Sequence, residues 1–216
     1  MKIGIFGCSY ACPVSNCGQP NYNMSGRSWM KILEEDFNYT VTSFGSSGSS
    51  MYYSYSLFKE NYKKYDKIVF LGTYPDRKYC PNFGKQHVLF SNTHKDFTNI
   101  EYYEPIKIYF KYFHNPKEAD DMKELMVDDI KKIGGNRTLY IDTPTTLGKV
   151  TIMEGMSRIT TGNLPDDHRW CHMSNENNYI FASQVNDWLT GNPFVFDFSS
   201  FKKPTVKELK SYYALT

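Results

Sequence analysis

The chain has 216 residues and a formal net charge of +2, and none of its apolar runs approaches the roughly 20 residues that span a membrane. This length is enough for one sizeable α/β domain with a buried core. A nearly neutral chain gives no reason to expect nucleic acid or an anionic membrane as a partner. The apolar N-terminal stretch is too short for a secretory signal, so we expect a soluble, cytoplasmic protein.

Aromatic residues are abundant, at 17% of the chain, with 18 Tyr and 15 Phe. One explanation is the Lys/Asn/Tyr-rich composition of an A/T-rich genome, such as that of a phage or bacterium. The other is a substrate cleft lined with aromatic rings. The sequence leaves both explanations open.

Five cysteines without an export signal indicate reduced thiols rather than a disulfide framework. Cys12, Cys17, Cys171 and His168 could supply four zinc ligands, but their spacing is not that of a zinc finger or ribbon. We therefore expect no metal and no organic cofactor.

Short apolar runs alternate with helical patterns along the chain, and no repeat or low-complexity linker divides it. We interpret residues 1–216 as one domain, with an insertion or lid at 78–115 and a C-terminal extension at 192–216. The predicted strands are 2–8, 40–44, 67–72 and 138–142. One predicted helix begins at Ser28, and three more cover 51–64, 116–133 and 175–189. The last of these has Ser174 as its N-cap and Gly191 after its end.

Strands that alternate with helices predict an α/β fold in which a mostly parallel sheet is covered on both faces. Ligands of such sheets bind beyond the carboxyl ends of the strands. Ser9, the small-residue turn at 45–50 and the residues after Gly72 all fall at that edge.

Two distant segments carry the residue types of a serine nucleophile system. Ser9 follows a buried strand at a Gly-Cys-Ser turn, and Asp166, Asp167, His168 and His172 cluster near the other end. A serine hydroxyl is a poor nucleophile until a base accepts its proton, and histidine titrates near neutral pH. A carboxylate behind the histidine fixes its tautomer and stabilises the imidazolium.

The arrangement resembles the SGNH (GDSL-type) hydrolases, a family of α/β/α esterases and lipases that have four sequence blocks. The first block matches residues 7–10, with Cys8 where the family usually has Asp. The second, Asn-x-Gly-x-x-Gly, becomes a run from Ser43 to Gly48 that keeps both glycines. The last matches at His172, with the small Ala182 ten positions later.

The resemblance implies a three-layer α/β/α, flavodoxin-like fold and assigns roles to particular residues. Ser9 would be the nucleophile, His172 the base and Asp167 its carboxylate, and the backbone N–H of Gly48 would help to bind the oxyanion. Tyr10, beside the nucleophile, falls among the expected oxyanion and substrate-binding residues.

The third block departs from the family pattern Gly-x-Asn-Asp, because Tyr74 stands at the position of the Asn. That Asn donates to the oxyanion, and the loss of one such donor costs about 2.7–4 kcal/mol of transition-state stabilisation. Tyr74 itself, or Ser46, Ser47 or Arg77, would have to compensate.

The fourth block departs as well, because Arg169 stands three residues before His172 where the family has Asp. We favour Asp167 as the partner of His172, with Asp166 and His168 as alternates.

These patterns predict a serine esterase that forms an acyl-enzyme at Ser9 and hydrolyses it with water. The aromatic content favours a deacetylase of O-acetylated carbohydrate, so the expected partner is a small-molecule or glycan ester. The alternative is a non-catalytic, carbohydrate-binding module on the same fold.

Overall fold

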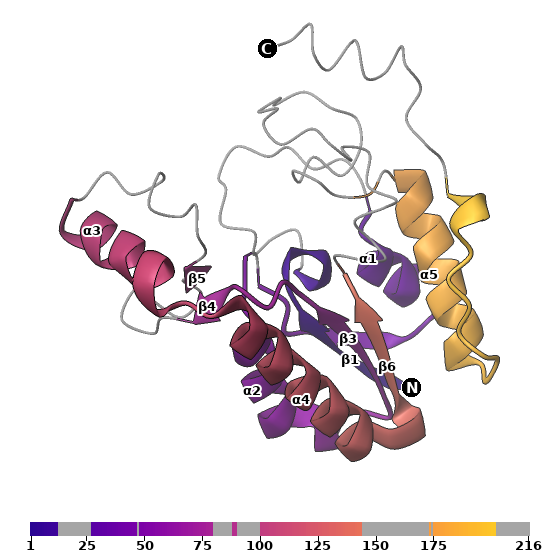
Figure 1. Ribbon diagram of the computed structural model, residues 1–216. Helices are drawn as coiled ribbons and strands as arrows, with labels where there is room; N and C mark the ends of the chain where they lie inside the picture. Colours follow the sequence, from indigo (N-terminus) through magenta and orange to yellow (C-terminus); the bar gives the residue numbers. More distant parts are fainter. Residues whose placement is uncertain are drawn as a thin grey trace, which may run out of the picture.

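A parallel sheet of four strands forms the centre of the computed structural model, which describes residues 1–12, 27–46, 48–79, 88–89, 100–143, 173 and 175–201 (Figure 1). The order across the sheet is β2-β1-β3-β6, and every neighbouring pair is parallel. All four predicted strands are confirmed. They are β1 (Lys2–Gly7), β2 (Thr40–Ser43), β3 (Lys67–Gly72) and β6 (Thr138–Asp142).

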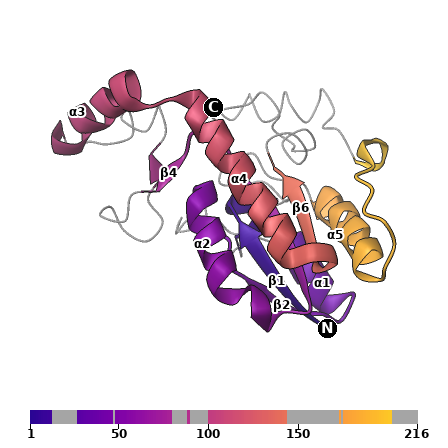
Figure 2. The same cartoon turned by 60° about the horizontal axis from the view of Figure 1, so that its bottom comes forward.

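Helices cover both faces of this sheet and complete a three-layer α/β/α fold, which confirms the predicted fold class (Figures 1 and 2). One face carries α1 (Trp29–Glu35) and α5 (Asn175–Leu189), and the other carries α2 (Met51–Asn61) and α4 (Pro116–Gly134). The predicted helix 51–64 is interrupted, since α2 ends at Asn61 and a 3-10 turn, Tyr62–Lys64, follows. Gly191 follows α5 with a positive φ, as expected.

The two faces are packed by different side chains because strand residues alternate between them. Towards α1 and α5 the sheet is aliphatic, and the helices add Trp29 and Phe181, whose rings meet edge-on at 4.9 Å. Towards α2 and α4 the sheet is aromatic. The ring of Phe6 stacks on that of Phe44 and makes an edge-to-face contact with that of Phe58. Much of the aromatic content therefore serves the core.

Capping side chains fix where three of the helices begin. The hydroxyl of Ser28 accepts from the N–H of Lys31 at 3.3 Å, and that of Ser50 accepts from Tyr53 at 3.1 Å. Asn115 caps α4, whose first residue is Pro116. Each cap satisfies an N–H group that the first helical turn leaves without a partner.

The region predicted as an insertion contains its own small elements. An antiparallel pair joins β4 (Lys78–Tyr79) to β5 (Val88–Leu89), and α3 (Ile100–Ile108) runs into a π-helical turn, Tyr109–Phe113. Helix α3 projects away from the sheet in both views (Figures 1 and 2). A role for this region as a lid stays a prediction.

Short 3-10 turns complete the described elements: η1 (Ser9–Ala11), η7 (Gly135–Arg137) and η9 (Phe198–Ser200). The start of the predicted C-terminal extension packs on this same chain, because Phe194 and Phe196 contact the core cluster and Phe201 is buried in it. Among the helices that the structure describes, none has the length and apolar character to cross a membrane.

Candidate active site

The loops that follow β1, β2 and β3 meet at the carboxyl edge of the sheet, and we call them the first, second and third loops. The first two are joined at the carbonyl oxygen of Gly7. Gly7 is the last residue of β1 and lies opposite Leu71 of β3. Its carbonyl accepts from the N–H of Ser46 at 3.2 Å and from the hydroxyl of Ser49 at 3.0 Å. The loop after β2 is therefore bound to the strand end that leads to Ser9.

Ser9 opens the 3-10 turn η1 and is half-buried. The turn is closed by the N–H of Ala11, which donates to Cys8 at 2.9 Å, and by that of Cys12, which donates to Ser9 at 3.1 Å. The hydroxyl of Ser9 thus lies on a short, hydrogen-bonded turn directly after a buried strand. Such a turn can present a nucleophile at a sheet edge with little conformational freedom.

The thiols of Cys8 and Cys12 are buried and form no disulfide. Within the described ranges, no three His, Cys, Asp or Glu side chains are grouped so that they could hold a metal ion. Cys17, Cys171 and His168, the other residues of the zinc hypothesis, lie outside those ranges.

Ser43 takes a structural role at the position where the family resemblance places Asn. Its hydroxyl donates to the carbonyl of Ala11 and accepts from the N–H of Gly45 at 3.0 Å. Gly45 lies so close to the Ala11–Cys12 peptide that a Cβ at this position would overlap backbone atoms. The second block is therefore held directly against the turn that carries Ser9.

Gly48 and Ser46, the two candidate oxyanion residues of the second loop, differ in conformation and burial. Gly48 has φ +72°, a conformation that L side chains rarely adopt, and there is open space where a Cβ would stand. The hydroxyl of Ser46 is buried, with the residue 3% exposed, and it finds no hydrogen-bond partner in the described part of the chain. A buried hydroxyl without a hydrogen-bond partner is costly, and Thr138 and Thr143 have such hydroxyls as well among the described residues.

Tyr74 and Arg77 lie together after β3. Tyr74 is exposed, and the guanidinium of Arg77 lies 5.3 Å from the centre of its ring. Arg77 also approaches the carbonyl of Ser49 at 3.5 Å, which brings the third loop to the second. These contacts place both residues at the predicted edge; a hydrogen bond from Tyr74 to the oxyanion stays a prediction.

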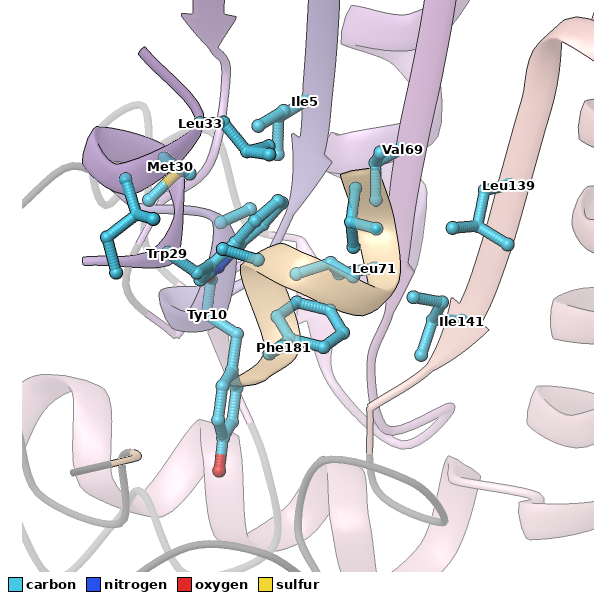
Figure 3. Packing of buried hydrophobic residues seen from close by; sticks show 14 of the residues in the cluster. Ile5, Tyr10, Trp29, Met30, Leu33, Val69, Leu71, Leu139, Ile141 and Phe181 are labelled. Carbon is cyan, nitrogen blue, oxygen red and sulfur yellow. The ribbon is translucent and has the colours of Figure 1, made fainter. Parts of the chain in front are cut away.

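Tyr10 is part of the core cluster on the α1 side and is 8% exposed. Its carbonyl accepts from the indole N–H of Trp29 at 2.8 Å. In Figure 3 the ring of Tyr10 extends away from the aliphatic side chains of the sheet, with its hydroxyl at the far end. A contact between that hydroxyl and substrate remains a prediction.

Aromatic rings gather at the start of α2, the helix that follows the second loop. Tyr52 and Tyr53 lie in the first turn of α2, directly after Ser50, and the ring centre of Tyr79 lies 6.3 Å and 5.2 Å from theirs. Tyr52 is largely exposed. We refer to Tyr52, Tyr53 and Tyr79 as the tyrosine cluster.

An ion pair that sequence reasoning missed stands at the end of β6. The ammonium of Lys123 lies 2.6 Å from a carboxylate oxygen of Asp142, and the hydroxyl of Tyr140 donates to the same oxygen at 3.4 Å. Burial, together with the neighbouring charge of Asp142, raises the pKa of Tyr140 well above its usual value. Tyr140 is therefore neutral and able to donate, and Asp142 is engaged in a structural pair.

The predicted histidine base and its carboxylate lie outside the described residues. His172, Asp167, Asp166 and His168 all fall there, so their roles stay predictions. Met173, which directly follows His172, is described and is buried.

Comparisons with known proteins bear on the fold alone. No family model and no curated protein matches the chain. Among solved structures, the chain is similar to a protein described as lipolytic and of the G-D-S-L family from Desulfitobacterium hafniense DCB-2, with 12% identity, 87% and 98% of the two chains covered and a TM-score of 0.37. It is also similar to a catalytic mutant of an acetylxylan esterase from Geobacillus stearothermophilus, with 14% identity, 91% and 96% covered and a TM-score of 0.36. A member of the lipolytic protein G-D-S-L family from Veillonella parvula DSM 2008 has 13% identity, 84% and 93% covered and a TM-score of 0.30.

The two glycines of the second block should respond differently to alanine. Gly45→Ala should lower the free energy of unfolding by about 3 kcal/mol, because the new methyl group overlaps the Ala11–Cys12 backbone. Gly48→Ala meets no atoms and should cost only about 1 kcal/mol, from its positive φ. Urea unfolding of both variants measures the difference, and an equal or smaller loss for Gly45→Ala would contradict the close packing of these loops.

Proposed function

We propose that this protein is a serine ester hydrolase in which Ser9 is the nucleophile. The observation that carries the proposal is the junction at Gly7, where the turn of Ser9 and the loop of Ser46 and Gly48 are bound to one strand end. Catalysis of acyl transfer needs a nucleophile and oxyanion donors that are fixed relative to each other before the substrate arrives. A junction that binds both loops to one strand end supports this proposal.

The reaction would proceed in two steps. His172 accepts the proton of the Ser9 hydroxyl as its oxygen attacks the ester carbonyl, and the same proton then goes to the departing alcohol. Water, deprotonated by His172, attacks the acyl-enzyme and releases the acid and free Ser9. Asp167 is the proposed carboxylate behind His172, with Asp166 and His168 as alternates.

The proposed oxyanion donors are the backbone N–H of Gly48 and the hydroxyl of Ser46. Tyr74 stands where the family has Asn, and its ring lies against Arg77, so its hydroxyl stays an alternative donor to that of Ser46. Ser46 suits this role, because its hydroxyl is buried beside the Ser9 turn and has no partner among the described residues. Donation to an oxyanion would satisfy that hydroxyl only when the transition state is bound, which is the condition for rate acceleration.

An O-acetylated carbohydrate is the substrate class that the surroundings support best. Sugar rings present apolar C–H faces that pack on aromatic rings, while their hydroxyl groups bind polar side chains. The tyrosine cluster offers such faces beside the second loop, and Arg77 offers a cation and N–H donors nearby. Acetyl is the acyl group we propose.

Reaction with a fluorophosphonate probe tests the proposed nucleophile. The wild-type protein should form one adduct, located on Ser9 by peptide mass mapping. Ser9→Ala and His172→Ala should lower the labelling rate by about 10³-fold or more, because each removes a member of the nucleophile system. Thermal unfolding of each variant controls for folding. Absence of an adduct in folded wild-type protein would reject the proposal and favour the non-catalytic carbohydrate-binding module.

Ser46→Ala tests the proposed oxyanion donor. The labelling rate should fall about 10²-fold. Stability should not fall, because the hydroxyl loses no hydrogen bond among the described residues. Thr143→Val is the matched control, since Thr143 is also buried and its hydroxyl also lacks a partner there, but it follows β6. Equal labelling rates for the two variants would remove Ser46 from the site.

Tyr52→Ala tests the carbohydrate-binding role of the tyrosine cluster. For an acetylated oligosaccharide, KM should rise about fivefold, equivalent to about 1 kcal/mol, with kcat unchanged. The rate with p-nitrophenyl acetate, which has no sugar, should stay the same. Tyr179→Ala controls for the loss of an exposed tyrosine, because Tyr179 has similar exposure on α5. A rise in KM for both esters, or for neither, would contradict this role.

A further inference from the structure

A chain of buried hydrogen bonds connects the segment of Ser9 to the residue that follows His172. The indole N–H of Trp29 donates to the carbonyl of Tyr10 at 2.8 Å. The backbone N–H of the same Trp29 donates to the side-chain oxygen of Asn178 at 3.0 Å. The side-chain N–H of Asn178 then donates to the carbonyl of Met173 at 3.0 Å.

The residues that form this series of hydrogen bonds are deeply buried. Trp29 and Asn178 are fully buried, and Met173 is 2% exposed. Hydrogen bonds shielded from water exchange little with solvent, and a buried amide that loses one partner carries the full cost of desolvation. The three bonds therefore fix their end points more firmly than surface contacts would.

The series of hydrogen bonds matters because of the residues at its two ends. Tyr10 directly follows Ser9, the proposed nucleophile, and Met173 directly follows His172, the proposed base. Consecutive Cα atoms are about 3.8 Å apart across a trans peptide, so holding Tyr10 and Met173 keeps the Cα atom of each preceding residue within that distance. The connection passes through α1 and α5 and does not depend on the sheet.

We propose that Trp29 and Asn178 are positioning residues that set the separation of Ser9 and His172. Trp29 binds the nucleophile segment, and Asn178 binds the segment of the base while it also satisfies the first N–H of α1. This inference rests on the proposed function. It goes further by assigning a role in catalysis to two buried residues that contact no substrate.

Asn178→Asp is designed to keep one of the two hydrogen bonds of the Asn178 side chain and to remove the other. In its ionised form the carboxylate can still accept from the N–H of Trp29, but it cannot donate to the carbonyl of Met173. Because burial disfavours the charged form, the comparison is made at alkaline pH, where the carboxyl is ionised. Asn186→Asp is the matched control, because Asn186 lies on the same helix, where its side-chain oxygen accepts from the hydroxyl of Tyr39 at 2.8 Å. When ionised, both variants add one negative charge to α5.

The fluorophosphonate labelling rate of Ser9 is measured across pH, together with thermal unfolding. On the alkaline plateau, where His172 is neutral, Asn178→Asp should label about tenfold to a hundredfold more slowly, since a displacement of about 1 Å can cost this much. Asn186→Asp should label at the wild-type rate. A folded Asn178→Asp protein that labels at the wild-type rate would overturn the proposal, as would an equal loss in both variants. If Asn178→Asp does not fold, Asn178→Ser replaces it with the same criteria, since its side chain is too short to bridge both partners.

Hydrogen–deuterium exchange separates failure of this proposal from failure of the proposed function. The peptide containing Met173 should exchange faster in Asn178→Asp than in the wild type, and at the wild-type rate in Asn186→Asp. If wild-type protein is not labelled by the probe, the proposed hydrolase function fails and exchange alone decides whether Asn178 restrains this segment. Unchanged exchange at Met173 in Asn178→Asp would reject the restraint in either case.

Discussion

The carbonyl of Gly7 is the point on which the arrangement of the site depends. A strand that ends inside a parallel sheet leaves its last carbonyl to be satisfied from outside the ladder. Here Ser46 and Ser49 satisfy it, and both come from the loop after the neighbouring strand β2. One requirement of backbone hydrogen bonding thereby brings the candidate nucleophile turn and the candidate oxyanion loop together.

The two faces of the sheet support this edge in different ways. The aromatic face packs Phe6 against Phe44, the residue that begins the second loop, so the core itself holds that loop in place. The aliphatic face carries the buried polar connection through Trp29 and Asn178. A rigid scaffold of this kind suits a site whose donors must be in position before charge develops.

The sheet and the helices that cover it could be predicted because their signals are local. Apolar runs that end at Gly7 and Gly72, and caps such as Ser28, depend only on neighbours in the chain. The β4–β5 pair has two residues in each strand, too few to show a period, and α3 contains Pro105, which disfavours a helix. The bond between Trp29 and Asn178 joins residues 149 positions apart, and no local pattern reports such a contact. The candidate residues of the first three blocks could be placed at one edge of the sheet from topology, while the histidine and its carboxylate rest on sequence alone.

Two hydroxyl side chains stand where the resembled family has amides, and they do different work. Ser43 replaces an Asn in the second block, and its hydroxyl joins Ala11 to Gly45 within the protein. Tyr74 replaces an Asn in the third block and packs on Arg77. An amide can donate to substrate and accept from backbone at the same time, whereas a hydroxyl has a single proton to give. The proton of Ser43 is used by Ala11, whereas the buried hydroxyl of Ser46 lies in the same loop with its proton uncommitted among the described residues. We therefore propose that the donation lost with the Asn of the third block is taken over by the hydroxyl of Ser46, while Ser43 keeps a structural role in the second block.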